Sequence, residues 1–126
     1  MAAYPQAPRY ITETLRRGIV IPAHPLALTP ERQFDRRHQR ALTNYYLDAG
    51  AGGVAVGVHS TQFEIRESQY NLLRPVLGLA SETITAWERE HHRAQSIVRI
   101  AGICGNTQQA VQEAQIASSL GYHAGL

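Results

Sequence analysis

Short β-branched apolar runs alternate with longer amphipathic runs along this chain, and this order limits the folds that the chain can adopt. Four apolar runs predict strands, at residues 18–23, 53–58, 97–103 and 122–126. Three stretches with helical periodicity predict helices, at residues 36–49, 72–93 and 107–120. Strands that are joined through helices run parallel in one sheet, with right-handed crossovers. The sequence therefore predicts an α/β fold, either an open doubly wound sheet or part of a closed (β/α)8 barrel.

The domain organisation follows from the length of the chain. Its 126 residues are enough for one ordinary domain. Residues 1–17 are expected to form an N-terminal leader and a short helix, and residues 18–126 to form the domain. Asp35 is a good N-cap for the helix that follows it, and Asn106 or Thr107 can cap the last helix. The buried face predicted for that last helix comprises Ala110, Val111, Ala114, Ala117 and Leu120.

Charge and composition exclude several classes of function. The net charge of +2 is too small to indicate nucleic-acid binding, and no apolar window is long enough to predict a membrane span. The single Cys104 excludes an internal disulfide and a thiolate zinc cluster, and we expect a cytoplasmic protein. All 12 basic residues are arginine, so a mechanism that needs a lysine amine as nucleophile cannot be completed by these residues.

A polar loop follows the predicted strand at residues 53–58, and it is the first candidate for a functional site. In parallel α/β folds, ligands bind beyond the carboxyl ends of the strands. The hydroxyls of Ser60 and Thr61 could donate to a carboxylate and pass a proton, or they could make turn hydrogen bonds. His59 could act as an acid, a base or a substrate contact, or it could simply be exposed.

Five segments of the sequence resemble the dihydrodipicolinate synthase and N-acetylneuraminate lyase family of class I, pyruvate-dependent aldolases. They match, in order, the family's first strand and its turn, the start of the first helix, the second strand, the third strand with its cap, and the beginning of the fourth strand. The segments are residues 18–26 (GIVIPAHPL), 34–35 (FD), 49–57 (AGAGGVAVG), 100–107 (IAGICGNT) and 120–126 (LGYHAGL).

This resemblance implies a fold and an activity. The fold would be the first half, about three and a half βα units, of a TIM (β/α)8 barrel. The activity would be that of a lyase that forms a Schiff base between a lysine and pyruvate or a related 2-keto acid, with no metal or other cofactor and as a homo-oligomer. The family's lysine lies on the sixth strand, which would follow Leu126. We therefore expect this chain to be a truncated piece that is inactive alone.

The resemblance also assigns roles to the polar loop. The family's Gly-Thr-Thr-Gly-Glu loop holds the keto-acid carboxylate and joins a proton relay. Ser60 and Thr61 are the closest equivalents of the two threonines, as catalytic and substrate-binding residues, and His59 is a further substrate contact. Glu64 stands in for the motif's glutamate, and the second glycine is missing.

Two alternatives belong to other classes of function. The chain could be a non-catalytic α/β binding or interaction module. It could also be a metal-dependent hydrolase in which His24 and His59, each at the end of a predicted strand, bind the metal.

Overall fold

A computed structural model describes residues 6–126, so part of the predicted leader lies outside the described residues. The short helix predicted before residue 18 is confirmed as α1. The elements in chain order are α1 (Arg9–Arg17), α2 (Arg36–Asp48), β1 (Gly53–Val56), the short 3-10 helices η1 (His59–Thr61) and η2 (Phe63–Arg66), α3 (Leu73–Glu90), β2 (Val98–Ala101), α4 (Thr107–Ser119) and β3 (Ala124–Gly125).

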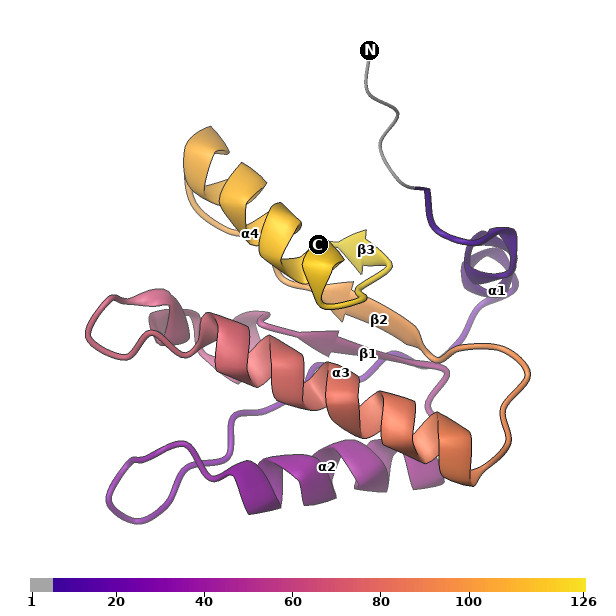
Figure 1. Ribbon diagram of the computed structural model, residues 1–126, viewed down its shortest axis with the longest axis horizontal. Helices are drawn as coiled ribbons and strands as arrows, with labels where there is room; N and C mark the ends of the chain where they lie inside the picture. The colour runs from indigo at the N-terminus through magenta and orange to yellow at the C-terminus, as the bar shows by residue number, and fades with distance from the viewer. Residues whose placement is uncertain (1–5) are drawn as a thin grey trace.

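The three strands form a parallel sheet in the order β1-β2-β3, as the alternation of strands and helices predicted. Gly53 of β1 lies opposite Val98 of β2, and Ile100 of β2 lies opposite Ala124 of β3. Figure 1 shows α3 running next to β1, with α2 below α3 and with β2 and α4 above β1. Helices therefore connect and cover parallel strands, which is the arrangement of βα units.

The strand predicted at residues 18–23 is reduced to a single bridge between Ala23 and Ala55 of β1. The segment is nevertheless paired to β1, since the Ala55 N–H donates to the Pro22 carbonyl (3.0 Å) and the His24 N–H donates to the Ala55 carbonyl (2.8 Å). A further bridge on the N-terminal side would require a donor at position 22, and proline has no N–H. On the other side, the Gly57 N–H donates to the Thr61 hydroxyl and not to the His24 carbonyl. Pro22 and Thr61 together limit this segment to a single bridge.

Two predicted helix starts are confirmed by their caps. The Asp35 carboxylate accepts a hydrogen bond from the His38 N–H at 3.0 Å, one turn into α2. The Asn106 side chain accepts one from the Gln109 N–H at 3.0 Å, so Asn106, and not Thr107, is the N-cap of α4. Each cap satisfies one of the backbone donors that a helix leaves unpaired at its start, a contribution of about 1 kcal/mol.

The core lies between α3 and the sheet. Val54 and Val56 of β1 are fully buried and belong to the same apolar cluster as the inner face of α3. The helical periodicity predicted for this segment is confirmed, because Leu73, Val76, Leu77, Ala80, Ile84 and Trp87 are all buried on α3. Burying a large apolar side chain contributes about 1.5–3 kcal/mol, so each large member of this stripe stabilises the domain. Within residues 6–126, no helix has the length and apolar character of a membrane span.

The buried face predicted for α4 is partly wrong. Val111 is 52% exposed and Ala114 is also exposed, whereas Glu113 is buried. The inward-facing Glu113 carboxylate accepts hydrogen bonds from Arg66, from the Cys104 N–H and from Gln109, one turn earlier in α4.

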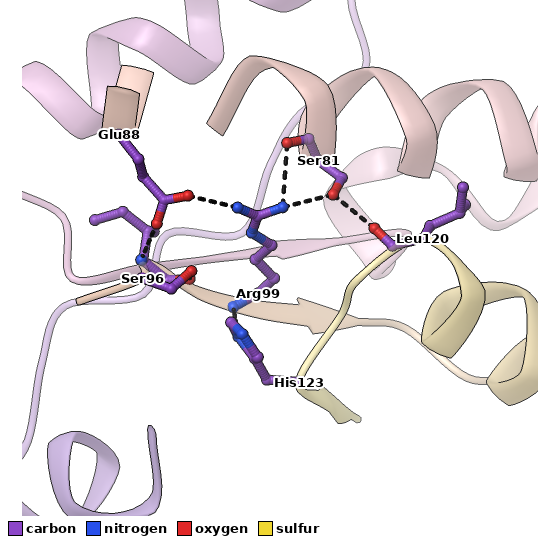
Figure 2. Close-up of polar contacts among 7 residues, drawn as sticks. Ser81, Glu88, Ser96, Arg99, Leu120 and His123 are labelled. Atoms are coloured by element: carbon purple, nitrogen blue, oxygen red, sulfur yellow. Dashed lines mark hydrogen bonds and ion pairs between the residues drawn. The ribbon is translucent and has the colours of Figure 1, made fainter. Parts of the chain in front are cut away.

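A buried polar group joins β2 to the helices that cover it. Figure 2 shows the Arg99 guanidinium between Glu88 and Ser81 of α3, with Nη2 2.6 Å from Glu88 Oε1 and Nη1 2.7 Å from Ser81 Oγ. Ser81 Oγ in turn donates to the Leu120 carbonyl at the end of α4 (2.6 Å). A buried ion pair adds little net stability, but its hydrogen bonds fix how β2, α3 and α4 are placed relative to one another.

Candidate functional site

The carboxyl ends of the extended first segment, β1 and β2 meet at one edge of the sheet, and the residues that follow β1 cover this edge. We call residues 57–66, which include η1 and η2, the β1 loop. The two strand ends approach very closely, because a Cβ at Gly102 would lie 2.2 Å from the Gly57 carbonyl oxygen. The Gly102 N–H donates to the Val56 carbonyl at 2.7 Å, so the ladder ends just where the loop begins.

Thr61 is fully buried and ties the β1 loop to the sheet edge. Its hydroxyl donates to the His24 carbonyl at 2.6 Å and accepts a hydrogen bond from the Gly57 N–H at 3.0 Å. The sequence left open whether this hydroxyl contacts a ligand or makes turn hydrogen bonds. Both of its observed partners are backbone groups, so in this conformation Thr61 organises the loop.

Ser60 and His59 lie beside Thr61 in η1, at the carboxyl end of β1. Ser60 is half-buried and His59 is exposed. The His59 and Phe63 rings pack edge to face, with 5.8 Å between their centroids. The structure therefore brings the three predicted site residues together, and their contacts with a ligand stay a prediction.

Gln62 follows this group in a strained backbone conformation. Its φ of 74° and ψ of 117° lie in a region that residues with a side chain rarely adopt. Gln62 comes directly after the Ser60-Thr61 pair, and its side chain is exposed. A non-glycine residue in such a conformation costs about 1–3 kcal/mol, so the surrounding contacts hold the loop in this shape.

Arg66 and Glu113 complete the site and were not predicted from the sequence. Arg66 Nη2 donates to the carbonyls of Gly57 (2.8 Å) and Gly102 (3.0 Å), and its Nε lies 2.7 Å from Glu113 Oε1. Glu113 also accepts from the Cys104 N–H and from Gln109. One signal in the sequence points to Glu113, namely a lone carboxylate at helical spacing within the predicted apolar face of α4. No comparable signal marks Arg66.

The histidine pair of the hydrolase alternative is not assembled. His24 is fully buried against α2, where Nδ1 lies 2.7 Å from the Pro25 carbonyl oxygen and Nε2 lies 2.6 Å from Thr43 Oγ1. Burial lowers the pKa of the His24 imidazole, although the Pro25 carbonyl opposes this shift. Both ring nitrogens are thus engaged within the protein, while His59 packs on Phe63. Among residues 6–126, no group of three or more His, Cys, Asp or Glu side chains is placed to hold a metal ion.

Comparison with known proteins gives matches only among solved structures. No protein family model matches this sequence, and a search of curated proteins finds no similar protein. A protein from Pseudomonas aeruginosa assigned as a dihydrodipicolinate synthetase superposes with a TM-score of 0.67 at 19% identity. The match covers 83% of this chain and 33% of that chain. The dihydrodipicolinate synthase of Bacillus clausii superposes with a TM-score of 0.63 at 20% identity, over 83% of this chain and 31% of that chain.

These matches confirm the predicted fold class. The chain is α/β, with three parallel strands alternating with helices, and it matches part of the TIM barrel of dihydrodipicolinate synthases. It spans about a third of the length of the structures that it matches. At this level of identity the likeness concerns the fold, and the chemistry has to be argued from the site.

Proposed function

We propose that this chain is the N-terminal part of a Schiff-base lyase of the dihydrodipicolinate synthase type, and that its β1 loop binds the carboxylate of pyruvate or a related 2-keto acid. One observation carries the proposal. The β1 loop presents two adjacent hydroxyl residues and a histidine at the carboxyl end of a strand, in a fold that matches dihydrodipicolinate synthases. Barrels of this kind hold their active sites at that end of the strands.

In this scheme the chain binds and orients the 2-keto acid, and a lysine outside this sequence supplies the amine. A 2-keto acid forms an imine when a lysine nitrogen attacks its keto carbon, and the sequence contains no lysine. Holding the carboxylate fixes the direction in which the keto carbon faces the amine, which is a large part of the catalytic advantage. The loop is the part of the site that these residues supply.

Ser60 and Thr61 take different parts in this proposal. The Thr61 hydroxyl already donates to the His24 carbonyl, so it passes a proton only after releasing that bond. Ser60 is half-buried beside it and is therefore the donor to the carboxylate in the ground state. His59 is exposed and lies at the edge of the ligand.

A binding experiment tests the proposal on the chain itself. We expect pyruvate to shift the backbone amide signals of residues 57–62 in the nitrogen-15 NMR spectrum, because the loop forms without the rest of the barrel. Acetone has the same carbonyl but no carboxylate, and it should leave these signals in place. Ser60→Ala should weaken the pyruvate effect, whereas Ser68→Ala, an exposed serine just beyond the loop, should not.

The same experiment separates the second candidate, a non-catalytic binding module. The observation that favours this candidate is the Thr61 hydroxyl, which is held by backbone groups on both sides and has no free proton to pass. Under this alternative neither pyruvate nor acetone shifts the loop signals, or both shift them equally. Either result would refute carboxylate recognition by the β1 loop.

A further inference from the structure

We propose that Arg66 is the positioning residue of the β1 loop, acting on Ser60 and His59 through the backbone of Gly57 and the ring of Phe63. What the loop binds rests on the proposed function above, but the positioning itself can be measured without any ligand.

The first support is the pair of carbonyl groups that Arg66 holds. Gly57 and Gly102 lie just beyond the last rungs of the ladder between β1 and β2, where the sheet no longer supplies donors. Arg66 Nη2 donates to the Gly57 carbonyl at 2.8 Å and to the Gly102 carbonyl at 3.0 Å. One side chain from the loop therefore closes both strand ends and fixes the point at which the loop leaves β1.

The second support is the way in which Arg66 itself is fixed. Its Nε donates to Glu113 Oε1 of α4 at 2.7 Å, and the two side chains are only 8% and 6% exposed. Glu113 is anchored in turn, because Oε1 accepts from the Cys104 N–H (3.1 Å) and Oε2 from Gln109 Nε2 (2.7 Å). The planar guanidinium can serve three acceptors in one orientation, which a lysine ammonium on a flexible stem cannot reproduce.

Arg66 also reaches the residues predicted to meet the ligand. Its guanidinium carbon lies 5.7 Å from the centroid of the Phe63 ring, within the range of a cation–π contact. Phe63 also contacts His59, with 5.8 Å between the centroids of the two rings. The chain of contacts thus runs from Arg66 through Phe63 to His59, on the exposed side of the loop.

The contacts of Arg66 are not those that would contribute most to stability. Within residues 6–126, Arg66 Nη1 is buried without a hydrogen-bond partner, and an unpaired buried donor is costly. Buried ion pairs are in general poor stabilisers compared with apolar packing. The strained Gln62 indicates, independently, that the loop is kept in a conformation it would not adopt freely.

The chain contains a matched control for the experiment. Arg99 and Glu88 form a second buried pair, 2.6 Å apart and with side chains 9% and 15% exposed, and Arg99 Nε is likewise an unpaired buried donor among the described residues. This pair joins β2 to α3 and makes no hydrogen bond to the β1 loop (Figure 2). Arg99→Gln therefore reports the general effect of losing a buried arginine.

The test measures amide hydrogen exchange in the labelled 126-residue chain, without ligand. The Thr61 N–H donates to the Val58 carbonyl and the Gln62 N–H to the His59 carbonyl, so both amides report whether the loop is formed. In Arg66→Gln we expect these two amides to exchange at least about tenfold faster relative to the amide of Ala55 in β1. Arg66→Lys should give an intermediate increase, and Arg99→Gln should change loop and strand amides together.

Other outcomes of these experiments would contradict the proposal. If Arg66→Gln does not fold, Arg66→Lys and Glu113→Gln decide the matter, since both keep part of the hydrogen bonding. Loop exchange that follows the strand amide in every folded Arg66 variant would overturn the proposal. Pyruvate titration of the same samples is a separate readout, and Arg66→Gln should weaken it about tenfold while Arg99→Gln leaves it within about twofold. If the unmodified chain shows no pyruvate effect, the proposed function fails and the exchange data still decide the role of Arg66.

Discussion

The His123 imidazole takes the place of a backbone acceptor for Arg99. Its Nδ1 accepts the Arg99 N–H at 3.0 Å, and the His123 N–H donates to the Arg99 carbonyl at 2.8 Å (Figure 2). The side chain and the backbone of His123 thus both pair with the backbone of Arg99 in β2, immediately before β3 begins. Since an acceptor nitrogen cannot carry a proton, the pairing depends on a neutral ring.

We predict that the chain loses stability as the pH falls below about 6.5. Burial lowers the pKa of His123, the positive Arg99 lowers it further, and Glu88 partly opposes this. Burial likewise lowers the pKa of His24. Between the lowered pKa of each folded group and its ordinary value, the unfolded chain binds more protons, so the free energy of unfolding rises with pH through this window. Urea unfolding at a series of pH values measures this slope.

The control for this prediction is His123→Asn, whose Oδ1 can accept the Arg99 N–H at any pH. We expect a shallower dependence of the urea midpoint on pH, with the remainder due to His24. A slope equal to that of the unmodified chain would show that His123 is not one of the groups that titrate on unfolding.

Removing the Thr61 hydroxyl should be costly. Thr61→Val keeps the shape of the side chain but leaves the Gly57 N–H and the His24 carbonyl without their partner. Each unpaired buried group costs about 1–3 kcal/mol, so we expect a loss of at least about 2 kcal/mol in the free energy of unfolding. Thr61→Ser keeps the hydroxyl and should lose only about 1 kcal/mol, the contribution of a methyl group. Equal losses for the two variants, measured by urea unfolding, would contradict the assigned hydrogen bonds.

Replacing Gln62 should reveal the strain in the β1 loop. Glycine adopts positive φ freely, whereas alanine is as restricted as glutamine. We therefore expect Gln62→Gly to be more stable than Gln62→Ala by about 1 kcal/mol, the part of the strain that remains after the greater entropy of unfolded glycine is subtracted. Thermal unfolding of the two variants provides the comparison. If alanine proves equal or better, Gln62 does not hold the strained φ of 74° in solution.

The isolated chain should not form a covalent adduct with pyruvate. Reduction with borohydride traps an imine formed between a primary amine and the keto carbon, and lysine, the side chain that supplies such an amine, is absent from this sequence. We expect peptide mapping after treatment with pyruvate and borohydride to show no mass increase on any internal residue, and we expect no lyase activity from the chain alone. A mass increase on an internal residue would be incompatible with the division of roles proposed above.

The parts of the fold that depend on local sequence could be predicted. Asp35 and Asn106 act on N–H groups three residues away, and the apolar stripe of α3 is set by its own periodicity. The first strand could be predicted only in part, because Pro22 lacks a donor on one side of the bridge and the distant Thr61 hydroxyl takes the Gly57 N–H on the other. Local signals of this kind act over a few residues, and the structure follows them closely.

The contacts that shape the candidate site could not be predicted in the same way. Arg66 and Glu113 are 47 residues apart, and Thr61 and His24 are 37 residues apart. Neither pair leaves a pattern in its own segment, and an arginine in a polar loop is normally read as solvated. The position of Ser60 and His59 was predictable from the end of a strand, but which hydroxyl is already occupied became visible only when the strand ends were brought together.

The close approach of Gly102 to Gly57 has an evolutionary consequence. Any side chain at position 102 would collide with the Gly57 carbonyl oxygen. Substitutions at this position therefore cannot change the shape of the site unless β1 and β2 move apart. We therefore expect ligand preference to vary through substitutions in the β1 loop, at positions such as 59, 60 and 63. Substitutions there leave the pairing of β1 with β2 intact.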